Sequence, residues 1–378
     1  MASHNIKQRL NSIFNKVCIF LLILSLVLII LKLYKSIHKL YHPYMLGDWL
    51  INYEDGGFKR RGLSGSFFFF IQDITNLKLS LLVWGFQSLF NIYFFYFLIK
   101  IISLQNKWFY TILFFTPVTL LFWIWDPESL GRKDIMILAL FAHYIYLLLK
   151  NSFSSLYKYT IFSFFISVSI LFHEPCIFYL PYFIFAISLC NQHKSKQKLI
   201  YSTLIISIPP ILAAASILLF GKMDFSYGET LNILHSRGIS YISDALINFK
   251  DDPSIHNLYF NYTYLFPLSY LLVVIYLYET TFNKKKIVFW ILIIAIICSI
   301  PLFLKAIDWG RWIFIHAILS AILLALLENT NKHIHTHIKY IYVIFIILGI
   351  LLFKMPLTTP KVGILPSIFI RTLKLLSF

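Results

Sequence analysis

Charged side chains are scarce in this sequence of 378 residues. Asp, Glu, Lys and Arg make up 13% of it, whereas soluble domains carry about 25%. Hydrophobic residues reach 59%, and the mean hydropathy is +0.76. Apolar runs long enough to cross a hydrocarbon layer about 30 Å thick recur from end to end. The composition therefore excludes a soluble globular protein and indicates one that crosses the membrane many times.

Cysteines and metal-binding motifs are also scarce. No HExxH, Walker or zinc-finger spacing occurs, and no DxD motif accompanies a nucleotide site. His333, His335 and His337 alternate in a loop predicted to be cytoplasmic, and this spacing spreads the rings around a helix. The four cysteines lie in or beside apolar runs, without zinc or redox spacing: Cys18, Cys176, Cys190 and Cys298. We therefore predict no metal ion and no cofactor.

The apolar runs predict an all-α fold, a transmembrane helical bundle of about 11 spans that forms one integral membrane domain over residues 1–378. Short helices on the outer face and one larger periplasmic loop, 221–259, are expected between the spans. Pro366, Arg371 and Lys374 interrupt the last apolar stretch, so 356–378 is predicted to be a helix in the membrane interface. The expected spans are 17–35, 79–99, 108–125, 135–149, 159–172, 176–190, 199–220, 260–279, 287–304, 313–327 and 339–353.

Positive charge is concentrated in the short loops between spans, and the net charge is +17. With a cytoplasmic N-terminus, every cytoplasmic loop carries lysine, as the positive-inside rule requires. This holds only if residues 159–190 form two short helices that meet at "HEP" (173–175) rather than one long helix. The same distribution explains the basic charge without nucleic acid, for which neither a recognised fold nor a contiguous basic face is present.

Acidic residues gather on the opposite, outer face. Of the sixteen Asp and Glu residues, only Glu279 and Glu328 fall at cytoplasmic ends of spans. The positive-inside rule concerns Lys and Arg and does not demand this of carboxylates. The outer face is therefore where carboxylates and cations are expected to meet.

The first outer segment, "GDWLINYEDGGFKRRG" (47–62), contributes carboxylates and adjacent arginines. Its glycines allow a tight turn, and its arginines offer planar forks that fit phosphate oxygens. An ion-paired surface lattice that merely orders the loop is the alternative interpretation. The candidate residues in this segment are Asp48, Glu54, Asp55, Arg60 and Arg61.

Four more outer segments carry charges: "DPESLGRKD" (126–134), "HEP" (173–175), "GETLNILHSRG" (228–238) and "DWGRW" (308–312). Helix capping, snorkelling and plain solvation are alternative explanations for several of these charges. Unpaired charges at the mouth of an apolar helix nevertheless cost several kcal/mol. The candidate residues in these segments are Glu128, Arg132, His173, Glu174, Arg237, Asp308, Trp309 and Arg311.

Glu174 and His173 are the expected acid–base pair, because they are isolated between two apolar runs. Desolvation there is expected to raise the pKa of Glu174 toward the range of a base that activates a hydroxyl. Asp48, Glu54 and Asp55 are the alternatives for this role.

The arginines are expected to bind phosphate groups, since the guanidinium fork makes strong paired hydrogen bonds with them. Arg60 and Arg61 come first, with Arg132 and Arg311 as further candidates. Tryptophan and tyrosine side chains suit stacking on sugar faces. Together these residue types fit the transfer of a glycan from a polyprenyl-linked donor at the outer face.

With "GGFKRRG", "GRKD" and "DWGRW", its many spans and its single larger outer loop, the chain resembles the bacterial O-antigen and capsular polysaccharide polymerases. The resemblance implies a glycosyltransferase of the bacterial inner membrane with a periplasmic active face. It would transfer an oligosaccharide from undecaprenyl diphosphate to a second lipid-linked repeat unit, without metal or nucleotide. The implied partners are the undecaprenyl-diphosphate-linked oligosaccharide and membrane lipids, with a chain-length regulator as a further candidate.

Two other function classes stay open. A GT-C glycosyltransferase that uses polyprenyl-phosphate sugars would take Asp48, Glu54 or Asp55 as its base, although the larger GT-C enzymes carry a C-terminal soluble domain that this sequence does not show. A flippase or other transporter of lipid-linked oligosaccharides would carry charges along a path inside several spans. The predicted spans are nearly free of charge.

Overall fold

The computed structural model describes residues 2–38, 44–54, 56–105, 110–111, 113–116, 118–125, 127–152, 155–190, 195–221, 227–239, 285–305 and 308–326. Within these ranges the chain is helical and contains no strand. The all-α prediction is therefore confirmed for this part of the chain. The expected spans 260–279 and 339–353 and the interfacial helix 356–378 lie outside the described residues.

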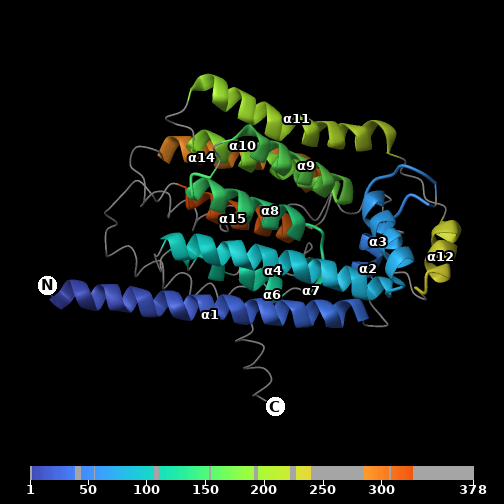
Figure 1. The fold of residues 1–378 in the computed structure, drawn as a ribbon, viewed down its shortest axis with the longest axis horizontal. Helices are drawn as coiled ribbons and strands as arrows, with labels where there is room; N and C mark the ends of the chain where they lie inside the picture. The colour runs from blue at the N-terminus through green and yellow to red at the C-terminus, as the bar shows by residue number, and fades with distance from the viewer. Residues whose placement is uncertain are drawn as a thin grey trace, which may run out of the picture.

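Long helices run side by side along the longest axis of the molecule (Figure 1). Three of them contain segments long and apolar enough to cross a membrane: Ile13–His38, Leu79–Gln105 and Lys196–Phe220. The remaining apolar helices are shorter. The elements of the bundle are α1 (Ala2–His38), α4 (Leu79–Gln105), α8 (Ile135–Leu149), α9 (Leu156–Phe172), α10 (Leu180–Cys190), α11 (Lys196–Phe220), α14 (Lys285–Lys305) and α15 (Trp309–Leu324).

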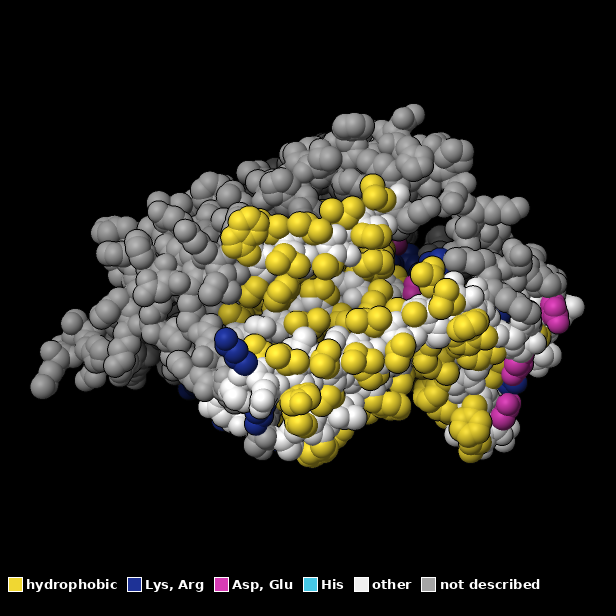
Figure 2. Space-filling view, turned by 90° about the horizontal axis from the view of Figure 1, so that it is seen from above, with side chains coloured by type: hydrophobic (Ala, Val, Ile, Leu, Met, Phe, Trp, Pro, Cys, Tyr) yellow, Lys and Arg dark blue, Asp and Glu magenta, His cyan; other side chains and the backbone are white. Residues whose placement is uncertain are grey.

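The surface of the bundle agrees with a membrane environment. On the face in Figure 2, hydrophobic side chains cover the middle. Lys and Arg lie toward both ends, whereas Asp and Glu lie toward one end only. Large apolar side chains of α1, α4 and α11 are exposed, among them Phe20 at 64%, Tyr96 at 53% and Leu212 at 63%. Exposed apolar surface on this scale is stable where lipid covers it.

α8 lies at the centre of the bundle, where it packs against α4, α9, α10 and α15. Its sequence "IMILALFAHYIYLLL" is apolar on every side, as a helix surrounded by other helices requires. Residues 135–142 are all buried. The helix therefore holds its first residues, next to Lys133 and Asp134, in a fixed place.

Two predicted spans differ from the structure. The span 17–35 is part of the longer helix α1, which begins at Ala2. The span 108–125 is not one continuous helix: a 3₁₀ turn, η1 (Leu113–Phe115), precedes α6 (Leu120–Trp125). The Thr119 hydroxyl accepts the Thr116 N–H at 2.9 Å and donates to the Leu113 carbonyl at 3.1 Å. Such local bonds compete with a regular helix, so the chain turns here.

Residues 156–190 form a helical hairpin, as the charge distribution predicted. α9 ends just before His173, and the 3₁₀ turn η2 (Glu174–Tyr179) leads into α10. The ring of Tyr144 on α8 lies 5.1 Å from that of Phe162 on α9 and 5.3 Å from that of Phe183 on α10. Phe162 and Phe183 precede and follow Glu174 by similar numbers of residues. The two helices therefore run in opposite directions.

One end of the bundle collects α2 (Tyr44–Trp49), α3 (Gly62–Thr75) and α12 (Tyr227–Ser236) (Figure 1). A second hydrophobic core joins them, with Trp49 of α2, Phe68 of α3 and Leu234 of α12 all buried. α9 ends at this end of the bundle, whereas α8 and α15 begin there. A short helix, α7 (Pro127–Leu130), precedes α8 in the chain. The charged segments that were predicted to face outward therefore meet at one end of an apolar bundle.

Candidate functional site

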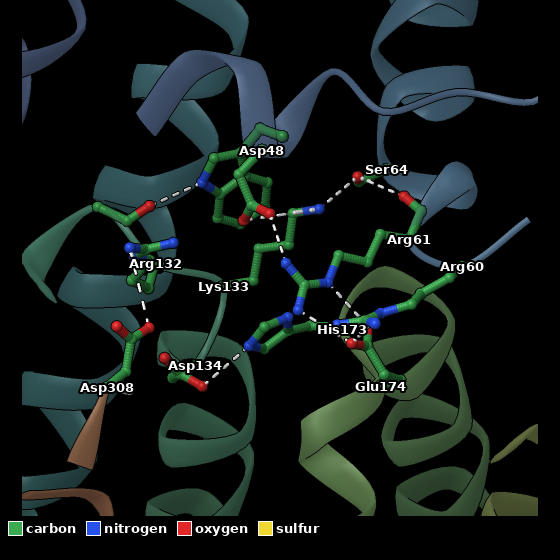
Figure 3. A network of polar contacts seen from close by, with 12 residues as sticks. Asp48, Arg60, Arg61, Ser64, Arg132, Lys133, Asp134, His173, Glu174 and Asp308 are labelled. Carbon is green, nitrogen blue, oxygen red and sulfur yellow. Dashed lines mark hydrogen bonds and ion pairs between the residues drawn. The ribbon is translucent and has the colours of Figure 1, made fainter. Parts of the chain in front are cut away.

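A network of ion pairs connects five separate segments at this end of the bundle (Figure 3). They are the end of α2, the start of α3, the turn before α8, the tip of the α9–α10 hairpin and the start of α15. The charged members are Asp48, Arg60, Arg61, Arg132, Lys133, Asp134, Glu174, Asp308 and Arg311, with His173 beside them. We call these ten residues the polar cluster.

Arg61 lies at the centre of one half of the cluster. Its Nη1 donates to Asp48 Oδ1 at 2.9 Å, and its Nε and Nη2 donate to the two oxygens of Glu174 at 2.8 and 2.9 Å. The Arg61 side chain is buried. The guanidinium fork therefore ties α2 to the tip of the hairpin with bidentate, charge-assisted bonds, which are the strong kind.

The backbone at Arg61 adopts a conformation that residues other than glycine seldom take. Arg61 has φ 64° and ψ 4°, the left-handed region, and it directly precedes α3. This conformation costs a non-glycine residue about 1–2 kcal/mol. The surrounding contacts therefore hold Arg61 in place, and such held conformations cluster at functional sites.

The chain approaches itself closely just after Arg61, which requires glycine. The amide of Gly65 donates to the Ile51 carbonyl at 2.8 Å. A Cβ added to Gly65 would lie 2.4 Å from that oxygen and 2.5 Å from the Leu50 oxygen. The first turn of α3 can therefore lie directly against the segment after α2, which brings Arg61 to Asp48.

Glu174 is an ion-paired anchor, which corrects the sequence-based expectation for its pKa. Arg60 donates from Nε to Glu174 Oε1, in addition to the two bonds from Arg61. Burial by itself raises the pKa of Glu174, but the charges of Arg61 and Arg60 and the Arg61 hydrogen bond outweigh it and hold the pKa well below its ordinary value. The sequence showed the apolar flanks of "HEP" but not the arginines that reach it from the first outer segment.

Lys133 is buried completely and connects the turn before α8 with α2 and α3. Its Nζ donates to Ser64 Oγ at 2.9 Å and lies 3.9 Å from Asp48 Oδ2. The Trp49 ring lies 5.7 Å from the same nitrogen. Burial lowers the pKa of Lys133 to about 8, although Asp48 opposes the shift. Burial raises the pKa of Asp48, but Lys133 and Arg61 outweigh it and hold this carboxyl well below its ordinary range.

The other half of the cluster is centred on Asp134. Its Oδ1 lies 3.2 Å from His173 Nε2, and its Oδ2 lies 3.2 Å from Arg311 Nε. Arg311 Nη1 donates to Asp308 Oδ2 at 3.0 Å, and Arg132 Nη2 lies 3.9 Å from the same oxygen. Arg311 also stacks on Trp312, with its Cζ 4.0 Å from the ring centroid.

These partners fix the ionisation of Asp134 and His173. Burial raises the pKa of Asp134, but Arg311 and His173 outweigh it, and the pKa falls to about 2. Burial lowers the pKa of His173, an effect that Asp134 only partly offsets. At neutral pH the pair is therefore a carboxylate beside a neutral imidazole.

The cluster is buried in its middle and open at its edge. Asp48, Lys133, Asp134 and His173 are all at most 3% exposed. The side chains of Arg60 and Glu174 are 29% and 20% exposed. Figure 2 shows Lys or Arg and Asp or Glu side chains in a hollow of the apolar face. With five cations and four carboxylates, the cluster carries an excess of positive charge that suits an anionic ligand arriving at the Arg60 edge.

Glu54 and Arg237, predicted to belong to the site, form a separate pair. Arg237 donates to Glu54 at 2.9 Å and to Asp73 at 2.8 Å, and its guanidinium lies over Phe69. Both carboxylates are exposed. Arg237 therefore attaches the end of α12 at the surface, to α3 through Asp73 and to the segment before α3 through Glu54. Asp55 lies outside the described residues, as do the side chains of Glu128 in α7 and Trp309 in α15.

Sequence reasoning assigned no role to Lys133, Asp134 or Ser64, which the structure places in the centre of the cluster. A signal for the first two was present, because "RKD" directly precedes the most uniformly apolar helix of the bundle. Ser64 gave no signal, since a serine in "GLSGS" is ordinary at the start of a helix.

The part of the chain that the structure describes contains no group of three or more His, Cys, Asp or Glu side chains placed to hold a metal ion. No family model matches the sequence, and no curated protein or solved structure matches it either. The function is therefore inferred from the chemistry of the polar cluster and from the resemblance carried by the sequence motifs.

Proposed function

We propose that this protein is a surface-polysaccharide polymerase, a glycosyltransferase that takes a glycan from an undecaprenyl-diphosphate-linked donor and adds it to a second lipid-linked repeat unit. The observation that carries the proposal is the buried, cation-rich polar cluster at the end of a bundle whose flanks are apolar. A lipid diphosphate complements this arrangement, because its long apolar chain suits the flanks of the bundle and its negatively charged headgroup suits the cluster.

The arginine edge of the cluster supports a diphosphate as the ligand. Arg60 is the more exposed partner of Glu174, at 29%. A phosphate oxygen that replaces Glu174 on Arg60 exchanges one charge-assisted bond for another, so binding need not leave a cation unpaired. After transfer, the leaving diphosphate gains negative charge, which the nearby Arg61 and Lys133 stabilise.

The proposed topology has 11 spans, with the N-terminus in the cytoplasm and the polar cluster at the periplasmic face of a bacterial inner membrane. The described ends of the bundle support this orientation. α8 begins beside the cluster and is followed at its far end by Lys150, and α9 and α11 carry Lys158 and Lys196 near their first residues. Lysines therefore gather at the end opposite the cluster, as expected of a cytoplasmic end.

Orientation can be measured with reporter fusions. An alkaline phosphatase fused after residue 48 or within 126–134 is expected to be active, because it would lie in the periplasm, and one fused within 191–198 inactive. Green fluorescent protein at the same points should give the opposite pattern. An active phosphatase at 191–198 would contradict both the hairpin orientation and the periplasmic site.

The function is tested by deletion of the gene in the strain that carries it. The lipopolysaccharide or capsule of the deletion strain is expected to lose its ladder of long chains and keep a single repeat unit, and a plasmid copy should restore the ladder. A repeat unit that lacks one sugar would instead indicate a GT-C glycosyltransferase. Accumulation of complete units on the cytoplasmic side would indicate a flippase, and either result would overturn the proposal.

A further inference from the structure

We propose that His173 is the catalytic base of this site and that Asp134, itself held by Arg311, is the residue that positions it. This inference rests on the proposed function and assigns the proton transfer within it. Figure 3 shows the His173 imidazole beside Asp134, in the region where the Arg61 and Glu174 side chains also meet. His173 is therefore next to both halves of the polar cluster.

The position of Asp134 indicates which nitrogen of His173 is available to take a proton. His173 Nε2 lies 3.2 Å from Asp134 Oδ1. Because a carboxylate can only accept, we infer that Nε2 carries the hydrogen of the neutral ring. In the neutral ring the other nitrogen, Nδ1, then carries the lone pair. Both ring nitrogens are buried and neither forms a hydrogen bond among the described residues, but only Nε2 has a carboxylate beside it. An unpartnered acceptor inside a polar cluster is costly unless a ligand uses it.

The carboxylates of the cluster are poorer bases than this imidazole. Glu174 accepts bonds from two arginines, and Asp48 faces both Arg61 and Lys133. Their lone pairs are engaged by cations, which disfavours uptake of a proton. Asp134 is likewise held between Arg311 and His173. His173 is thus the acceptor in the cluster that no cation contacts directly in the described structure.

The proposed step conserves atoms and charge. The acceptor hydroxyl oxygen forms a bond with the anomeric carbon of the donor, and its proton passes to His173 Nδ1. The bond between the anomeric carbon and the diphosphate oxygen breaks, and its electron pair leaves with the polyprenyl diphosphate. Asp134 stabilises the imidazolium that forms, which then releases its proton to water.

The pH dependence follows from the groups that face His173: Asp134 from the turn before α8, Arg61 from the residue before α3, Glu174 from η2 and Asp48 from α2. Burial, opposed in part by Asp134, sets the His173 pKa below the ordinary value of 6.5. The base is active when neutral, so the transfer rate should fall with acid at a midpoint below pH 6.5. Asp134→Asn removes the charge that favours the imidazolium, so it should move the midpoint to lower pH.

The test uses full-length protein in membranes that hold the strain's own lipid-linked repeat units. His173→Gln is expected to lower the transfer rate by about 100-fold or more, the usual contribution of a general base. Binding of farnesyl diphosphate, measured separately, should stay within about twofold, since the arginines remain. With His173→Ala, added imidazole should restore part of the rate. His143→Gln is the matched control, because His143 bonds Tyr93 within the bundle, at 2.6 Å.

The outcomes separate this inference from the proposed function. If wild-type membranes transfer no glycan, the proposed function fails. If the wild type transfers glycan and His173→Gln does so equally fast, only the role of His173 fails. Should the His173 variants not fold, the wild-type pH profile and Asp134→Asn still decide: a midpoint above pH 6.5, or one that Asp134→Asn leaves unchanged, overturns the inference.

Discussion

Arg61→Ala is expected to eliminate the polymer and to destabilise the protein, whereas Arg60→Ala is expected to eliminate the polymer and leave the fold intact. The two neighbours differ in what depends on them. Arg61 is buried and neutralises both Asp48 and Glu174. Arg60 contacts Glu174 from the open edge, with 29% of its side chain exposed. Arg61 therefore maintains the cluster, and Arg60 is the arginine that can change partners.

The expected loss of stability depends on how deeply each arginine is buried. Removal of one partner from a buried ion pair costs about 3–5 kcal/mol, because the other charge stays buried without compensation. Among the described residues, Arg61→Ala leaves Asp48 only Lys133 as an ion-pair partner, 3.9 Å away, and leaves Glu174 only the partly exposed Arg60. Both carboxylates therefore lose their buried partner, and the melting temperature in detergent should fall well below that of the wild type. Arg60→Ala leaves Glu174 with Arg61 and should melt near the wild-type temperature. Polymer length on a gel reports function, and fluorescence-detected gel filtration during heating reports the fold.

Arg237→Ala is the matched control for the arginine variants. Arg237 also contacts two carboxylates, but Glu54 and Asp73 are exposed to solvent. Surface ion pairs contribute about 0–1 kcal/mol, so this variant should melt and polymerise nearly as the wild type does. Arg61→Lys keeps the charge but loses the fork, and it should be impaired in both assays. If Arg61→Ala melted with the wild type, the structural role assigned to Arg61 would be wrong.

The sequence was sufficient to predict the helical class, the hairpin and most of the residues that meet in the cluster. These features depend on apolar periodicity and on the distribution of lysine between loops, which are one-dimensional signals. α8 and α11, for example, lie close to their expected spans of 135–149 and 199–220. The hairpin prediction also brought Glu174 to the same end of the bundle as Arg60 and Arg61.

The pairing within the cluster could not be predicted, because it depends on distances between segments far apart in the chain. Glu174 is surrounded by apolar residues in the sequence and by arginines in space. Desolvation and a nearby cation shift a carboxyl pKa in opposite directions. The arginines could not be placed beside Glu174 from the sequence, and they reverse the expected direction of its pKa shift. In the same way, nothing local indicated that Glu54 would pair with Arg237 at the surface.

Glu174→Gln is expected to bind farnesyl diphosphate more tightly than the wild type does, by about tenfold. Glu174 occupies the forks of Arg60 and Arg61 in the structure, and a diphosphate must compete with it. Glutamine keeps the shape of the side chain but accepts weaker hydrogen bonds, because it carries no charge. Loss of one charge-assisted bond of about 1.5–3 kcal/mol corresponds to a tenfold change or more.

The measurement is a titration of purified protein in nanodiscs with farnesyl diphosphate, at two salt concentrations. The affinity gain should be larger at low salt, because the cluster gains one net positive charge and salt screens its attraction for the ligand. Glu54→Gln is the matched control, since Glu54 also pairs with an arginine but lies outside the cluster. If Glu174→Gln instead bound the diphosphate as the wild type does and lost glycan transfer, Glu174 would be the base. Binding and proton transfer would then share one carboxylate, and His173 would serve only to position it.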